Sequence, residues 1–103
     1  MGTLATIIIT IGYGPNSAGI VPDRAAYHAD VLIAIARSGY TVAAQIHGDS
    51  VSEWGNEPAT WISAAGHPAD GAIALLRAQL RAVANDHKQD AIGIIVDGRY
   101  TEV

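Results

Sequence analysis

A glycine-rich loop is the first part of this sequence whose residue types could do chemistry. Residues 12–19 read Gly-Tyr-Gly-Pro-Asn-Ser-Ala-Gly, between an apolar run and a segment with a helical pattern. The backbone N–H groups of such a loop, with the start of the next helix, can bind a phosphate or a carboxylate. The loop matches neither the dinucleotide-binding pattern nor the P-loop, so it does not identify the ligand. The predicted ligand contacts here are Gly12, Tyr13, Gly14, Asn16, Ser17 and Arg24.

The segment from His47 to Glu57 is the second candidate, because it combines titratable, hydroxyl and aromatic side chains. A histidine near a carboxylate, here His47 and Asp49, could act as a general base. Trp54 offers a flat surface on which a base or a sugar could stack. We expect these three residues to contact the ligand. Polar residues are also common in loops without any function, which is the alternative interpretation.

The sequence predicts neither a metal site nor a catalytic nucleophile. No two of the four histidines share a helical turn, and the H-E-x-x-H arrangement is absent. The chain has no cysteine, which excludes disulfides and thiolate ligands. The G-x-S-x-G pattern of a serine nucleophile is absent as well. We therefore expect no metal and no cofactor, and we assign no catalytic residue.

Apolar runs and turn residues predict the elements that position the two segments. Helices are expected from Asp23 to Ser38 and from Pro68 to about Asp86. Loops are expected at residues 48–50 and 55–58. Trp61 is expected in the core. The expected strands are residues 4–11, 40–46, 59–64 and 92–96, and a hairpin at Asp97-Gly98 can add residues 99–103 as an edge strand.

This order of elements predicts an α+β fold of the ferredoxin-like split βαβ type (β-α-β-β-α-β), with an extra C-terminal hairpin strand as an option. The alternative is a three-strand parallel α/β sheet that omits residues 59–64. In the split plan the first two strands run parallel, so their carboxyl ends lie at one edge of the sheet. Residues 12–24 and 47–57 are therefore expected to meet at that edge.

Composition and charge limit the classes of partner. The 103 residues fit one domain, and the net charge of −4 with scattered basic residues disfavours nucleic acid and membrane as partners. The apolar run near the N-terminus has no basic residues before it, so we expect a cytoplasmic protein and no signal peptide. The segment 31–36 is apolar on more than one helical face, which predicts a homo-oligomer.

Together these features favour a small non-catalytic binding module. It would hold an anionic or nucleotide-like small molecule at the edge formed by residues 12–24 and 47–57. One alternative is a phage or actinobacterial accessory protein that acts through protein–protein interaction. The other is a small oligomeric enzyme in which His47 or His28 serves as acid or base.

Overall fold

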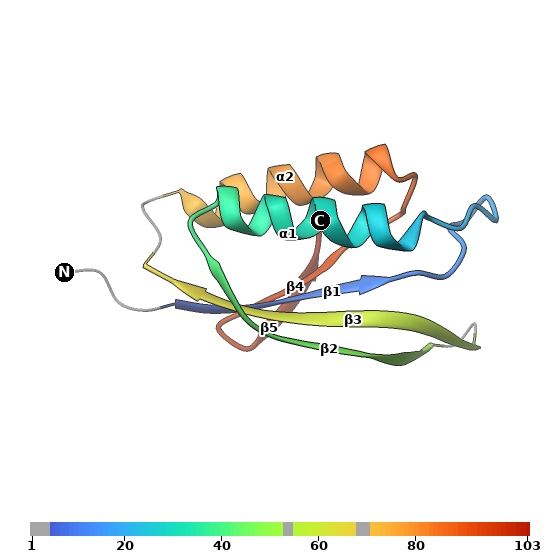
Figure 1. Ribbon diagram of the computed structural model, residues 1–103, viewed down its shortest axis with the longest axis horizontal. Coiled ribbons are helices and arrows are strands. Elements are labelled where there is room, and N and C mark those ends of the chain that lie inside the picture. The colour runs from blue at the N-terminus through green and yellow to red at the C-terminus, as the bar shows by residue number, and fades with distance from the viewer. Residues whose placement is uncertain (1–4, 53–54, 68–70) are drawn as a thin grey trace.

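Two helices cover one face of a single curved sheet in the computed structural model (Figure 1). The structure describes residues 5–52, 55–67 and 71–103. In chain order the elements are β1 (Ala5–Gly12), α1 (Arg24–Arg37), β2 (Thr41–Ser52), β3 (Gly55–Gly66), α2 (Ala72–Asp86), β4 (Gly93–Val96) and β5 (Arg99–Glu102). The predicted strand after Asp97-Gly98 is confirmed as β5.

The five strands lie in the order β2-β3-β1-β4-β5, and every neighbouring pair is antiparallel. The protein is thus a small α+β fold with a five-stranded antiparallel sheet and two helices. The parallel three-strand alternative is wrong, because β4 runs antiparallel to β1 and β3 lies beside β1. β1 and β2 point the same way, so the expectation that their carboxyl ends share one edge is confirmed.

The β2–β3 hairpin is longer than the sequence predicts. The segments 48–50 and 55–58, expected as loops, belong to strands of twelve residues each, and Asp49 pairs with Pro58 near the outer end. Antiparallel pairing satisfies the backbone N–H and C=O groups of these polar residues, which outweighs their weak preference for strands.

Pro58 is tolerated inside β3 because of where its backbone points. Its carbonyl oxygen accepts a hydrogen bond of 2.8 Å from the N–H of Tyr13. The N–H and C=O of a strand residue point to the same side, so the N–H that proline lacks would face Tyr13 and not β2. Pro58 therefore removes no hydrogen bond from the β2–β3 ladder.

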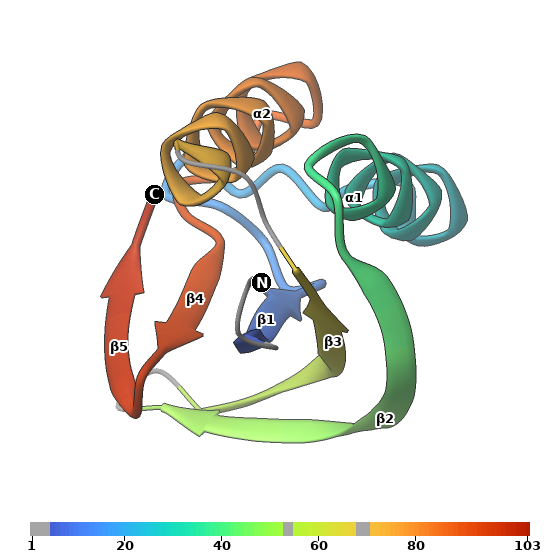
Figure 2. The same ribbon diagram turned by 90° about the vertical axis from the view of Figure 1, so that its left-hand side faces the viewer.

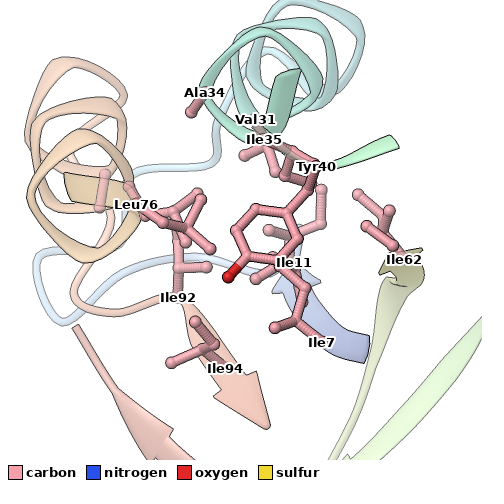
Figure 3. Close-up of a cluster of buried hydrophobic side chains, with 14 of the residues drawn as sticks. Ile7, Ile11, Val31, Ala34, Ile35, Tyr40, Ile62, Leu76, Ile92 and Ile94 are labelled. Carbon is pink, nitrogen blue, oxygen red and sulfur yellow. The ribbon is translucent and has the colours of Figure 1, made fainter. Parts of the chain in front are cut away.

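The core lies between the helices and the near face of the sheet. Ile7, Ile9 and Ile11 of β1 are at most 1% exposed and point toward the helices. Figure 3 shows Val31 and Ile35 of α1 and Leu76 of α2 packed over this face. The side chains of β1 that alternate with these isoleucines point to the opposite face, which no helix covers (Figure 2). The sheet thus has one buried face and one helix-free face.

The outer surfaces of both helices carry apolar side chains. Ile33 of α1 and Leu75 of α2 are 47% and 48% exposed. The homo-oligomer that the sequence predicts from α1 stays a prediction. Within the described residues, no helix is long and apolar enough to cross a membrane.

Tyr40→Phe is expected to raise the free energy of unfolding by up to about 1 kcal/mol, because the Tyr40 hydroxyl is buried without a hydrogen-bond partner among the described residues. Burial also raises the pKa of this group. The control is Tyr13→Phe, which removes a hydroxyl that lies 2.8 Å from Thr60 Oγ1 and should lower stability by about 1 kcal/mol. Urea unfolding measures both, and equal losses in the two variants would contradict this interpretation.

Candidate functional site

The helix-free face of the sheet encloses an open hollow of about 1110 Å³. Figure 2 shows the sheet curling so that the far part of the β2–β3 hairpin passes beneath β1 and β4. The loops at residues 14–17 and 89–91 close one end of the hollow, and β5 forms one side. The edge predicted from the sequence is therefore one end of a larger site that lies mainly on the sheet itself.

Small residues form the floor of this hollow. Thr10 at the centre is paired with Trp61 of β3 on one side and with Gly93 of β4 on the other. Two residues farther along β1, on the same face, Gly12 is paired with Ala59. Thr10, Gly12, Ala59 and Gly93 have short side chains or none, so they leave a depression beside the large side chain of Trp61.

Glu57 occupies the space that Gly12 and Gly14 leave open. A Cβ atom at either glycine would overlap the Glu57 carboxylate, and at Gly14 it would also lie 3.1 Å from the Glu57 Cβ. Glu57 is partly buried and lines the hollow. The two glycines therefore accommodate a carboxylate of the protein itself, at the place where the sequence suggested a bound anion.

The glycine-rich loop uses its backbone N–H groups internally. The Asn16 side-chain oxygen accepts from the N–H groups of Ala18 and Ile20 at 2.9 and 2.8 Å. The Ser17 N–H donates to the Asp90 carboxylate at 2.9 Å, and the Ser17 hydroxyl donates to the same group at 3.1 Å. The loop is thereby fixed to the segment after α2 and offers few donors to a ligand.

The start of α1 carries its own carboxylate. Asp23 is the N-cap residue, and its Oδ1 accepts from the Ala26 N–H at 3.1 Å. The position at a helix start that favours an anion is thus taken by Asp23. The Arg24 guanidinium lies over a residue of the loop itself, with its central carbon 4.5 Å from the centre of the Tyr13 ring.

The structure divides the predicted site residues between two surfaces. The residues that line the hollow are Gly12, Gly14, Asn16 and Ser17. Tyr13 belongs to the core, with its ring against that of Tyr27. His47 lies on the helix-covered face, where its Nδ1 is 2.7 Å from Thr60 Oγ1. Asp49 shares that face by alternation, and Trp54 lies outside the described residues.

The two histidines of the enzyme hypothesis are neighbours on this helix-covered side. The His28 and His47 rings are 5.8 Å apart and nearly perpendicular, and His28 Nε2 is 2.6 Å from Gln45 Oε1. They lie across the sheet from the hollow. Within residues 5–52, 55–67 and 71–103, no three side chains of the metal-binding types converge.

Sequence reasoning missed the two aromatic residues of the hollow. Trp61 lines the hollow and does not belong to the core, so the prediction that it is buried there is wrong. Its neighbours Thr60 and Ile62 are fully buried on the helix side, so strand alternation puts Trp61 on the other face. The alternation of side chains along β3 could have indicated this, but Trp61 and Ile62 are both apolar, so the sequence did not show which of them faces the core.

Tyr100 of β5 is the second missed residue. It is 54% exposed and lines the hollow, although its strand has only four residues. Burial of part of the ring and the nearby Glu102 raise the pKa of its hydroxyl, while a hydrogen bond with Thr10 acts in the opposite direction. Its position depends on the pairing of β5 with β4, which the hairpin signal at Asp97-Gly98 could have indicated.

Three solved structures share this fold. A phage SAM lyase in complex with S-methyl-5′-thioadenosine has a TM-score of 0.60 and 13% identity, over 100% of this chain and 91% of the lyase chain. A phage SAM lyase in its apo state has a TM-score of 0.57 and 12% identity, over 99% and 89%. An amidase of the hydantoinase/carbamoylase family from Burkholderia vietnamiensis has a TM-score of 0.54 and 20% identity, over 95% of this chain but 27% of its own. No family model and no curated protein sequence matches the chain.

Gly12→Ala is expected to lower the free energy of unfolding by about 1 kcal/mol, because the new methyl group displaces the Glu57 carboxylate. In a Glu57→Ala background the same change should be neutral or slightly stabilising, since glycine disfavours strands. A double-mutant cycle by urea unfolding measures the coupling. Equal costs of Gly12→Ala in both backgrounds would show that the two residues are not in contact.

Proposed function

We propose that this protein binds an adenosine-like nucleoside in the hollow, with an uncharged or positively charged group in place of a phosphate. The observation that carries the proposal is the chemistry of the lining. Trp61 and Tyr100 offer aromatic surface to a base, and the small floor leaves room for a ring. The volume of about 1110 Å³ is ample for a nucleoside.

The charges around the hollow favour this class of ligand over an anion. Glu57, Asp90 and Glu102 line it, and no lysine or arginine is among the described lining residues. Like charges repel at close range, so a phosphate would meet an unfavourable field, whereas a sulfonium or ammonium group would be attracted. Carboxylates also accept hydrogen bonds from ribose hydroxyls. We therefore narrow the expected ligand from an anionic or nucleotide-like molecule to a nucleoside.

The comparison with the phage SAM lyase supports the same ligand class. That protein shares the fold over nearly its whole length and is recorded with S-methyl-5′-thioadenosine, a nucleoside without a phosphate. We also propose that this chain follows the ferredoxin-like split βαβ plan, with β5 added. The strand order β2-β3-β1-β4 with helices on one face supports that assignment.

Isothermal titration with S-methyl-5′-thioadenosine, SAM, AMP and ATP tests the proposal. We expect the first two to bind and the two phosphate-bearing ligands to bind at least tenfold more weakly. Glu57→Gln should weaken binding of the sulfonium ligand SAM by about tenfold, because the attraction between the carboxylate and the positive charge of the ligand is lost. It should affect the uncharged thioadenosine less.

The matched control is Asp49→Asn, which removes a carboxylate from the same hairpin on the face away from the hollow. It should leave both affinities unchanged. Tighter binding of AMP or ATP than of the thioadenosine would contradict the proposal, as would the absence of binding by all four ligands.

A lyase is the second candidate function, favoured by the partly buried Glu57 carboxylate in the hollow and by the likeness to the lyase fold. A carboxylate in such a place can act as a base or stabilise developing positive charge. Incubation with SAM followed by chromatography for released S-methyl-5′-thioadenosine separates this function from simple binding. Turnover that survives in Glu57→Gln would exclude Glu57 from it.

A further inference from the structure

We infer that the exposed face of the Tyr100 ring is the platform on which the purine of the ligand stacks. This inference rests on the proposed function and assigns the base to one side of the hollow. It follows from three observations about Tyr100, Gly93 and Thr10, which lie together on β5, β4 and β1.

The Tyr100 ring lies where a side chain of Gly93 would otherwise be. A Cβ atom at Gly93 would lie 2.6 Å from the Tyr100 Cε2 and 2.8 Å from its hydroxyl oxygen. These distances are too short for any side chain, so glycine lets the ring rest against the backbone of β4. One side of the ring is thereby supported by the sheet.

The outer end of the ring is held as well. The Tyr100 hydroxyl is hydrogen-bonded to Thr10, the central residue of the floor. A ring that is supported from below and anchored at its hydroxyl loses little conformational freedom when a base stacks on it. Its remaining surface is open, because Tyr100 is 54% exposed and lines the hollow.

Trp61 is less suited to the same task. Its ring extends toward the edge strand β2, with Cζ3 3.6 Å from the position of a Cβ atom on Gly48. Trp61 is also less exposed than Tyr100. The two aromatic residues lie on opposite sides of Thr10, so a base on Tyr100 leaves the Trp61 side of the hollow for the rest of the ligand.

Titration of S-methyl-5′-thioadenosine into the Tyr100 variants tests the platform. Tyr100→Ala is expected to weaken binding about tenfold or more, as stacked bases do when their aromatic partner is removed. Tyr100→Phe keeps the ring and should stay within about threefold of the wild type. Gly93→Ala should also weaken binding, because the new methyl group displaces both the Tyr100 ring and the Thr10 hydroxyl beside it. Leu75→Ala on the outer surface of α2 is the control and should leave the affinity unchanged.

A probe without a base separates stacking from a general loss of the site. S-methyl-5-thioribose should bind wild type and Tyr100→Ala with the same affinity, while the thioadenosine discriminates between them. Upfield shifts of the purine protons in the nuclear magnetic resonance spectrum, lost in Tyr100→Ala, give a readout independent of affinity. If the wild type binds the thioadenosine and Tyr100→Ala binds it equally well, the platform is wrong and the proposed function stands. If the wild type binds no nucleoside, both are overturned.

Discussion

The central strand β1 has to serve two surfaces at once, and the rest of the molecule is built around that constraint. It pairs with β3 on one side and β4 on the other, so every other strand is placed relative to it. Its isoleucines at 7, 9 and 11 point into the core, while Thr10 and Gly12 face the hollow. Because the side-chain period of a strand is two, a slip of one residue would exchange the surfaces and lose both.

A glycine-rich loop can leave room either for an anionic ligand or for a carboxylate of the protein itself. Glycines beside a helix start often leave room for the phosphate of a ligand. Here Gly12 and Gly14 leave room for Glu57, and Asp23 caps the helix. The negative charge belongs to the protein, so a ligand that is electrostatically complementary to it is neutral or positive. The contact of Gly12 and Gly14 with Glu57 of β3 joins residues far apart in the sequence. The loop sequence alone therefore does not show which of the two groups occupies the space.

Much of the fold could be anticipated from local patterns. The β-branched run of β1, the capping residue Asp23 and the turn at Asp97-Gly98 each specify their own element without help from distant residues. The outer half of the β2–β3 hairpin could not be anticipated, because residues 48–50 and 55–58 have turn-like composition and become strands only by pairing with each other.

The site was anticipated at one end only. The topology brought residues 12–17 to the correct edge, since parallel strands end together. The remainder of the hollow depends on which residues of an apolar strand face outward, and a segment such as Thr60–Ile62 does not show this by itself. Tyr100 and Gly93 meet across two strands, so their relation appears only when the register is known.

The position of Pro58 has a mechanical consequence. The pairing of β1 with β3 ends at Gly12 and Ala59. The residues nearer the tip of the hairpin, 50–52 and 55–57, therefore pair only with each other in the sheet and extend past the end of β1. The hydrogen bond between Tyr13 and Pro58 lies at the root of this part of the hairpin. Because Ser50 and Glu57 of this part of the hairpin line the hollow, the angle of the hairpin at this point sets the width of the hollow, whereas Ile7 and Ile9 are fixed in the core on the other face of the sheet.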